Sequence, residues 1–351
     1  MSRWIDNNLA DRLYMVNHVS DSMDIDPESI EKDWWVTTVL KVLFDLSISE
    51  YTFFKGGTSL SKGWNLINRF SEDKDIALFR EFLLKEKSLS CARCENNNQI
   101  KMLRKSSHDF IHGELKTELE MKLKETGLDV IVEAVTTHMT AEGEKPIDHD
   151  ADPTVLLVHY PSIFHSGHSY IKPVVKIEIS CLSMKEPYEI KRISSLISDV
   201  FGDDDGDTAT NIATISPSRT FLEKAFLLNE EYQRRNPRTL RMSRHLYDLE
   251  KLMDTDYAKS ALRNMSLYTE IVEHRKKFYH VGGVDYSLDM PNMISFCPSG
   301  EILNRFRSDY ENMKSSFIYG NPLDFDLLIK RLEELQVRLR HLPFLLFICN
   351  M

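Results

Sequence analysis

Two aspartates, Asp73 and Asp75, stand one residue apart, shortly after the adjacent glycines Gly56 and Gly57. Alternate side chains of a β-strand point to the same face, so both carboxylates would face one cleft. Carboxylates that close repel each other unless a cation lies between them, and carboxylate oxygens are ligands that suit Mg²⁺ or Mn²⁺. The Asp-x-Asp pair therefore indicates a divalent metal site.

The glycine pair indicates a phosphate-binding turn. Such a turn exposes backbone N–H groups, and a helix that starts just after it presents its positive end to an anion. Thr58, Ser59 and Ser61 follow as hydroxyl donors. Lys62 adds a positive charge. Each half of this arrangement is common in ordinary loops, but together they are typical of phosphoryl or nucleotidyl transfer.

A third carboxylate is expected from a later strand of the same sheet, and Glu178 is the candidate. In VVKIEIS, residues 174–180, apolar residues alternate with Lys176 and Glu178. One face of this strand would pack on helices while the other lines a cleft. A surface strand that carries Lys and Glu has the same alternation, so periodicity alone leaves both interpretations open.

A basic stretch follows in a chain whose net charge is −10. Residues 218–244 contain three glutamates and seven basic residues: Arg219, Lys224, Arg234, Arg235, Arg238, Arg241 and Arg244. This local surplus of positive charge suits a nucleoside triphosphate or an RNA backbone, and it suits a pair of solvated helices equally well. The acidic balance of the whole chain argues against a globally basic DNA-binding protein.

A second possible metal site has the spacing of a two-Cys, two-His zinc centre. It combines Cys91 and Cys94 with His108 and His112. The residues between the two pairs are mostly polar and supply little core for a free-standing zinc finger, so we expect no zinc there.

The elements that must position these residues are helices and strands in a mixed order. Asp26-Pro27-Glu28 has the form of a helix start, and residues 1 to about 50 are expected to be helical. Further helices are expected over 114–127, 217–235, 241–253, 258–279, 302–319 and 324–339. Strands are expected over 128–135, 154–160, 173–180 and 188–193.

Length and composition set wider bounds. With 351 residues the chain is long enough for two domains. No segment is long and apolar enough for a membrane span, and the N-terminus lacks the apolar region of a secretory signal. Five scattered cysteines fit a reducing compartment, so a cytoplasmic location is expected. The acidic run 202–207 is interpreted as a turn, and the apolar end 343–351 as a docking segment.

Several of these segments resemble one family. GGTSLSKGWNLINRFSEDKD, residues 56–75, is similar to the first motif of the AbiEii/AbiGii toxin nucleotidyltransferases, relatives of DNA polymerase β that include the MenT toxins. TFLEKAFLL, residues 220–228, and SRHLYDLEKL, residues 243–252, resemble its third and fourth motifs. The segment EHRKKFYH and the helix around Asp309 extend the resemblance over nearly the whole chain.

The resemblance implies an α/β (α+β) nucleotidyltransferase core with a mixed sheet. It implies a helical N-terminal segment (1–50), the core (51–215) and a helical C-terminal domain (216–351). It implies catalytic roles for Asp73, Asp75, Glu178, Lys224 and Asp248, of which the first three would bind metal. It implies nucleotide binding by Gly56, Gly57, Thr58, Ser59, Lys62, Lys176 and Arg244.

The activity implied is transfer of a nucleoside monophosphate from an NTP to an RNA, at the 3′ end of tRNA, with Mg²⁺ (or Mn²⁺) and release of pyrophosphate. The protein would then be a toxin of an abortive-infection system with a separately encoded antitoxin as partner. Two alternatives stay open. One is nucleotidyl transfer to a small-molecule or protein hydroxyl, and the other is a non-catalytic regulatory or binding protein on the same fold.

Overall fold

The computed structural model of the chain describes residues 3–71, 73–140, 142–164, 171–184, 187–202 and 209–342. The acidic run 202–207, apart from its first residue, and the apolar end 343–351 lie outside the described residues. The chain forms two compact units. The first comprises residues 1–63 and 71–214, and the second comprises 64–70 and 215–351.

This division differs from the expected domains in two respects. Residues 1–50 pack into the same unit as most of the expected core 51–215, and the short segment 64–70 belongs to the helical second unit. Two contacts explain the second difference. The Trp64 indole donates to the Ile215 carbonyl oxygen at 3.0 Å, and Arg69 pairs with Asp248.

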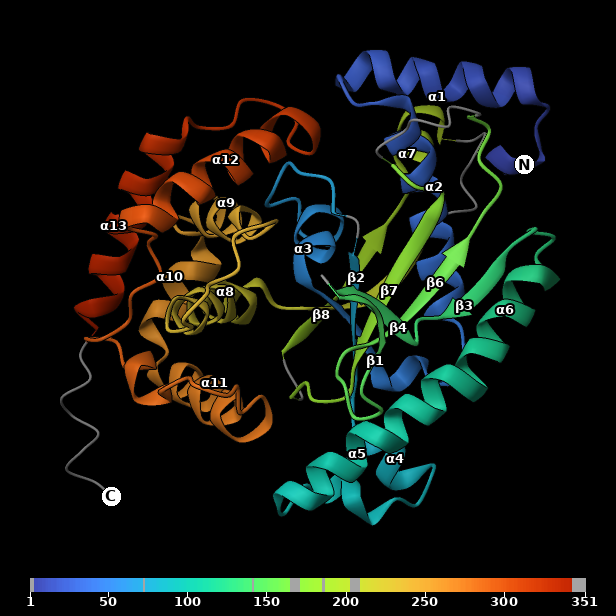
Figure 1. The fold of residues 1–351 in the computed structure, drawn as a ribbon. Coiled ribbons are helices and arrows are strands. Elements are labelled where there is room, and N and C mark those ends of the chain that lie inside the picture. Colours follow the sequence, from blue (N-terminus) through green and yellow to red (C-terminus); the bar gives the residue numbers. More distant parts are fainter. Residues whose placement is uncertain are drawn as a thin grey trace. The chain divides into compact units, whose positions relative to one another are not determined.

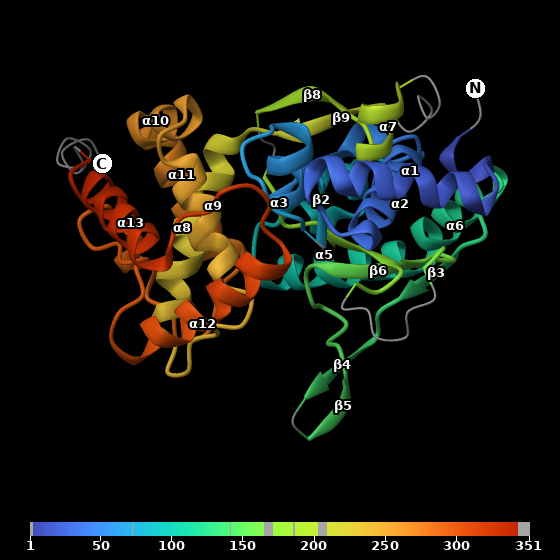
Figure 2. The same cartoon turned by 90° about the horizontal axis from the view of Figure 1, so that it is seen from above.

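The first unit is built on a mixed seven-stranded sheet with the order β3-β6-β7-β2-β1-β9-β8. A separate hairpin, β4–β5, extends away from this sheet (Figure 2). The strands are β1 Thr52–Lys55, β2 Asp73–Leu78, β3 Ile131–Ala134, β4 Thr137–Thr140, β5 Gly143–Pro146, β6 Thr154–His159, β7 Val174–Ser180, β8 Tyr188–Ile193 and β9 Thr210–Ile215. The expected strands are confirmed, whereas β1, β4, β5 and β9 were not predicted as separate strands.

Helices surround this sheet, with α2 against β7 and α6 against β3 (Figure 1). The α-helices of the unit are α1 Leu9–Met23, α2 Pro27–Leu43, α3 Gly56–Thr58, α4 Glu81–Lys85, α5 Asn97–Phe110, α6 Lys116–Glu125 and α7 Leu196–Phe201. Shorter helical turns are η1 Trp4–Asp6, η2 Ser49–Tyr51, η3 Ser59–Gly63, η4 Ser90–Arg93 and η5 Ile111–Leu115, of which η3 and η5 are π-helical.

The predicted helix start at Asp26 is confirmed. The Asp26 carboxylate accepts a hydrogen bond from the Glu28 backbone N–H at 2.9 Å, and Pro27 occupies the first helical position, where its missing N–H has no consequence. Trp34 and Trp35 are fully buried, and their rings meet edge to face at 5.2 Å. Helix α2 is therefore an internal support for the sheet.

The second unit is helical in its described residues. Its helices are α8 Pro217–Tyr232, α9 Ser243–Leu252, α10 Asp256–Arg263, α11 Met265–Phe278, η7 Tyr286–Asp289, α12 Gly300–Ser316 and α13 Phe325–Arg340. The helix expected over 258–279 is wrong as a single element, because Asn264 ends α10 and caps α11 by accepting from the Leu267 N–H at 3.0 Å. Asp309 on α12 accepts from the backbone N–H and hydroxyl of Ser243 at the start of α9.

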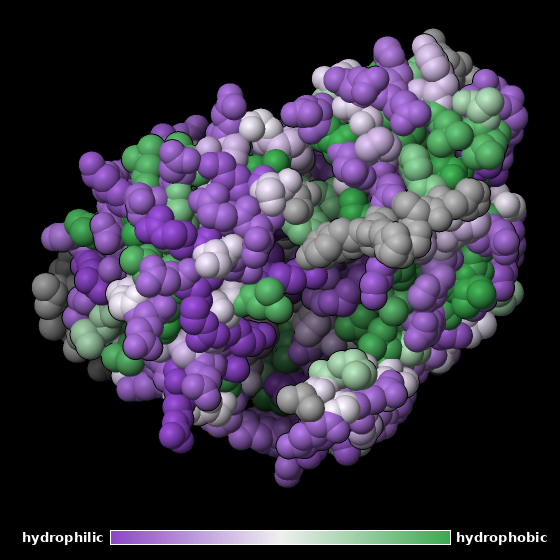
Figure 3. All heavy atoms as spheres, turned by 45° about the horizontal axis from the view of Figure 1, so that its top comes forward, coloured by the Kyte–Doolittle hydropathy of each residue, from purple (hydrophilic) through white to green (hydrophobic). Residues whose placement is uncertain are grey.

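None of the helices in the described ranges is both long and apolar enough to cross a membrane. On the face of the molecule shown in Figure 3, hydrophilic side chains predominate and hydrophobic side chains form separate groups between them.

Candidate active site

The pairing of β2 with β7 brings the predicted carboxylates together. The two strands run parallel, with Asp75 opposite Glu178 and Asp73 opposite Lys176. Residues directly opposite in a parallel pair share a face, so all four side chains point to the same side of the sheet. On the other flank of β2, Lys55 lies opposite Asp75 in the antiparallel partner strand β1. A row of charged side chains thus crosses three adjacent strands.

A lysine lies between two of the carboxylates. The Lys176 ammonium is 3.1 Å from Asp73 Oδ1 and 2.5 Å from Glu178 Oε1. Burial raises the pKa of Glu178, and the charges of Asp75 and Asp73 raise it further, against the opposing effect of Lys176. Burial alone would lower the pKa of Lys176, but Glu178 and Asp73 outweigh it and raise the pKa. The ammonium therefore stands where the carboxylates need a cation.

The donor set fits a hard divalent cation. Three carboxylates on one face that repel one another are relieved by a positive charge between them, and oxygen ligands suit Mg²⁺. Among the described residues, the one group of potential ligands whose atoms all lie within 4.8 Å of one another is elsewhere, at His108, Asp109 and His149.

The glycine turn lies directly against Asp75. Gly56 has φ +74°, a conformation that L side chains rarely adopt. A Cβ atom at this position would lie 1.8 Å from Asp75 Oδ2, which is an impossible contact. Only glycine therefore lets the turn approach the carboxylate this closely, and the approach joins the two halves of the predicted site.

The hydroxyl groups after the glycines hold the turn in place. Thr58 donates to the Asp73 carbonyl oxygen at 2.7 Å and so ties the turn to β2. Ser59 donates to the Gly56 carbonyl oxygen at 2.9 Å, and Ser61 donates to that of Thr58 at 3.1 Å. Thr58 and Ser59 are buried, so in this structure their hydroxyls fix the backbone of the turn.

Lys62, at the end of the turn, forms an ion pair with helix α2. Its ammonium lies 2.5 Å from Asp33 Oδ1 on α2. Asp33 also accepts from the Leu196 backbone N–H at 2.8 Å. Lys62 thus joins the end of the turn to α2, which is a contact that its sequence position did not reveal.

The second unit holds Lys224 and Asp248 in a buried ionic cluster. Arg69 Nε donates to Asp248 Oδ1 at 2.7 Å and Arg69 Nη2 donates to Asp248 Oδ2 at 2.8 Å, and the Lys224 ammonium lies 2.8 Å from the same Oδ2. Burial alone would raise the pKa of Asp248, but Arg69 and Lys224 hold it well below its usual range. The Arg244 guanidinium donates to the Arg241 carbonyl oxygen at 2.9 Å.

Much of the basic stretch is neutralised by ion pairs inside the second unit. Arg219 pairs with Glu223 at 2.9 Å, and Arg238 pairs with Glu231 at 2.7 Å. Arg234 also lies 3.5 Å from Glu231, so with Lys224 at least four of the seven basic residues have acidic partners. The exposed positive charge is smaller than the sequence count suggests.

Sequence reasoning missed two residues of this face. Lys55, just before the glycines, donates to the Ser183 hydroxyl at 3.1 Å. Asp152 accepts from the Ser180 hydroxyl at 2.6 Å and from the Cys181 backbone N–H at 3.0 Å, at the end of β7. Burial raises the pKa of Asp152, and Lys55 lowers it. The position of Lys55 directly before the glycine pair could have identified it from the sequence, whereas no sequence pattern marks Asp152.

The cysteines of the zinc spacing are not part of the cluster that His108 forms with Asp109 and His149. Cys94 is buried, and its Sγ contacts the Cys91 carbonyl oxygen at 3.7 Å. Burial lowers the pKa of His108, and the nearby His149 lowers it further.

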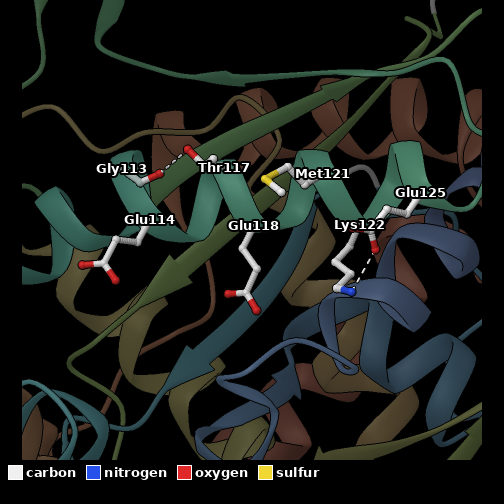
Figure 4. Close-up of a pocket in the computed structure, with 7 residues that line it drawn as sticks. All are labelled: Gly113, Glu114, Thr117, Glu118, Met121, Lys122 and Glu125. Atoms are coloured by element: carbon white, nitrogen blue, oxygen red, sulfur yellow. Dashed lines mark hydrogen bonds and ion pairs between the residues drawn. The ribbon is translucent and has the colours of Figure 1, made fainter.

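A separate hollow of about 640 Å³ runs along η5 and α6. Figure 4 shows its lining residues on successive turns, with Glu114, Glu118 and Glu125 among them. Glu118 accepts from the Ser47 backbone N–H and hydroxyl, both at 3.0 Å. The residues of the carboxylate row do not line this hollow.

A family model and several solved structures are similar to this chain. Residues 39–331 match the family model described as nucleotidyl transferase AbiEii toxin, type IV TA system. MenT4, a nucleotidyltransferase toxin from Mycobacterium tuberculosis H37Rv, is 14% identical over 97% of this chain and 88% of its own, with a TM-score of 0.47. JHP933 from Helicobacter pylori is 15% identical over 90% and 93%, with a TM-score of 0.42. No curated protein matches.

Proposed function

Because the chain belongs to the AbiEii family of nucleotidyltransferase toxins of type IV toxin–antitoxin systems, we propose that its acceptor is the 3′ end of tRNA. A nucleoside monophosphate passes from an NTP to the terminal hydroxyl, and pyrophosphate leaves. The observation that carries the nucleotidyl-transfer chemistry is the parallel register that pairs Asp75 with Glu178, together with the close approach of Gly56 to Asp75. Family membership implies an NTP substrate and an antitoxin partner.

Asp73, Asp75 and Glu178 would hold the divalent cations of the reaction. Mg²⁺ or Mn²⁺, when bound, lowers the pKa of the attacking hydroxyl and offsets charge on the leaving pyrophosphate. The backbone N–H groups of the Gly56-Gly57 turn are suited to the phosphates of the NTP. Lys176 and Lys55 add positive charge on the same face, so catalysis here consists mainly of positioning and electrostatic stabilisation.

Phosphate binding is also proposed for three basic residues: Lys62, Lys224 and Arg244. Each would have to exchange a present contact: Lys62 with Asp33, Lys224 with Asp248, and Arg244 with the Arg241 carbonyl oxygen. Thr58 and Ser59 contribute by fixing the turn, and Asp248 by holding Lys224 and Arg69.

A second acceptor class is favoured by one observation. At least four of the seven basic residues in 218–244 are in ion pairs, which reduces the positive charge that an RNA backbone would meet. Transfer to a protein or small-molecule hydroxyl by the same carboxylates is therefore the alternative, and the experiment below distinguishes the two.

The test is incubation of the purified protein with each labelled NTP, total tRNA and Mg²⁺. We expect label on tRNA with the wild type, loss of transfer by at least about a hundredfold with Asp75→Asn, and loss on chelation. Asp256→Asn is the matched control, because this acid is almost fully exposed at the start of α10 and should transfer as the wild type does.

Equal labelling by Asp75→Asn would contradict the assignment of the carboxylates. Label that enters proteins or small molecules from a cell extract but never tRNA would select the second acceptor class. Expression in cells adds a separate readout. We expect the wild type to arrest growth in the cytoplasm, where NTPs and tRNA are present, and Asp75→Asn to leave growth unaffected.

A further inference from the structure

A cluster of metal-ligating side chains lies apart from the carboxylate row. His108 and Asp109 are near the end of α5, and His149 is in the connection between β5 and β6. Each offers one ligand atom, and these atoms all lie within 4.8 Å of one another. His149 Nε2 is 2.6 Å from Asp109 Oδ1, and His108 Nδ1 is 3.7 Å from the same oxygen.

A third imidazole, that of His112, adjoins this cluster. The rings of His108 and His112 are 4.2 Å apart between centroids, and those of His108 and His149 are 4.6 Å apart. The π-helical turn η5 begins between them, at Ile111, and carries His112. Three imidazoles and one carboxylate from α5, η5 and the β5–β6 connection therefore converge on one place.

Two buried ring nitrogens in this group have no hydrogen-bond partner among the described residues: His108 Nδ1 and His112 Nε2. A buried polar atom left without a partner is unfavourable, and such atoms are rare in folded proteins. A hydrogen bond with the Val155 backbone involves the His112 ring. Such an outer contact is the usual way in which a metal-binding histidine is oriented.

We propose that His108, Asp109 and His149 form a binding site for a divalent transition-metal ion such as Zn²⁺, with His112 as an adjacent ligand. Imidazole nitrogen together with carboxylate oxygen is a donor set that zinc uses in proteins. The site lies outside the carboxylate row, and it differs from the two-Cys, two-His spacing of the sequence because it needs no cysteine.

The position of the site indicates a structural role. A metal ion bound there would join the β5–β6 connection to α5. The ion pair of Lys101 on α5 with Asp150 in this connection, at 3.9 Å, already links the two. The same connection continues to Asp152, which holds Ser180 and Cys181 at the end of β7. Metal binding would thus stabilise the connection whose Asp152 holds the end of β7, the strand that carries Glu178.

The test uses the full chain with the substitutions Asp75→Asn and Glu178→Gln, so that the carboxylate row contributes little to metal binding. After treatment with a chelator, the protein is dialysed against Zn²⁺, and bound metal and the thermal midpoint are measured. We expect one zinc per chain, a higher midpoint with zinc, and at least about tenfold weaker binding after His149→Ala.

His159→Ala is the matched control. His159 Nε2 lies 2.7 Å from Glu133 Oε2, so it is an equally exposed His–carboxylate pair outside the cluster, and its loss should leave zinc binding unchanged. Replacing Cys91 and Cys94 by serine should also leave it unchanged.

The proposal is overturned if the chelator-treated chain, shown to be folded by its thermal transition, binds no zinc. It is equally overturned if His149→Ala and Asp109→Asn bind zinc as the parent does, or if the cysteine replacements abolish binding. None of these outcomes depends on nucleotidyl transfer, so they leave the proposed function to its own experiment.

Discussion

At position 56 the turn has room for a hydrogen atom and for nothing larger. The missing Cβ of Gly56 brings the backbone of the turn against the Asp75 carboxylate, and the positive φ of this residue adds a second reason for glycine. The geometry of the candidate site therefore requires glycine at position 56 as well as the carboxylates.

Gly56→Ala should abolish transfer while the protein stays folded. The added methyl group must displace Asp75, and the left-handed backbone conformation costs about 1–2 kcal/mol in addition. Labelled NTP transfer and a thermal melt measure the two effects. Gly282→Ala, where a Cβ meets nothing within 4 Å, is the control and should retain activity. Full activity of Gly56→Ala would show that the close approach is unimportant.

The burial of Lys74 leads to a second prediction, on the pH dependence of stability. It lies between the two aspartates on the opposite face of β2, is fully buried and donates to the Ser71 carbonyl oxygen at 2.6 Å. Burial lowers the pKa of Lys74 to about 7. Nearby charges act in both directions: Lys32 and Lys62 lower the pKa, and Asp73 and Asp33 raise it.

The unfolded chain keeps the Lys74 proton up to a pKa of about 10.4, so between pH 7 and 10 the unfolded state binds more protons than the folded state. Wild-type stability should therefore rise with pH in this window, by at most about 1.4 kcal/mol per pH unit. Lys74→Met should lack this rise. Thermal midpoints of both proteins at pH 6, 7, 8 and 9 measure it, and a constant difference between them would refute the prediction.

The short segment 64–70 belongs to the second unit, although in sequence it lies between two parts of the first. It runs from the end of η3 to the residues before β2, and it is anchored in the second unit by Arg69 on Asp248. Lys224 on α8 completes this buried cluster, and Asp248 itself is on α9. Lys224 and Asp248 therefore stabilise the second unit through this ionic cluster, in the absence of any substrate.

Asp248→Asn should destabilise the second unit by about 3–5 kcal/mol, because it leaves the buried charges of Arg69 and Lys224 without their carboxylate. Asp254→Asn is the control. Asp254 pairs with Arg331 and Arg338 at the surface, where such pairs contribute about 1 kcal/mol or less. Denaturant melts that showed equal losses for the two variants would contradict the buried cluster as a main support.

For the molecule as a whole, the chain passes between its two units at three points, near residues 63, 70 and 214. The second unit is therefore discontinuous in sequence. Residues 215–342 without the segment 64–70 would lose several contacts. Among them are the Arg69 guanidinium on Asp248, the Trp64 indole on the Ile215 carbonyl oxygen, and the Phe70 N–H that donates to the Phe317 carbonyl oxygen at 2.7 Å.

A fragment of residues 215–342 should consequently fail to unfold cooperatively. Joining residues 64–70 to its N-terminus through a flexible linker should restore a cooperative transition, and the same fusion with Arg69→Met should not. Circular dichroism melts of the three fragments measure this. A cooperative transition in the fragment without 64–70 would mean that the helical part is independent of that segment.

The sequence by itself determined the local features of this protein. Asp26-Pro27 predicted the start of α2, the alternation in VVKIEIS predicted the two faces of β7, and the glycines followed by Asp73 and Asp75 predicted a turn and a strand. These patterns depend on backbone geometry and on neighbours a few residues away, so they are present in the sequence itself.

Only the tertiary structure decided which charges meet. The pairing of Lys62 with Asp33, of Arg69 with Asp248, and the place of Asp152 at the end of β7 join residues far apart in the chain. The same is true of the basic stretch, whose charge is partly cancelled by ion pairs. A charged residue has the same sequence signature whether it is solvated, paired or catalytic, because its partner is chosen by the packing of the whole fold.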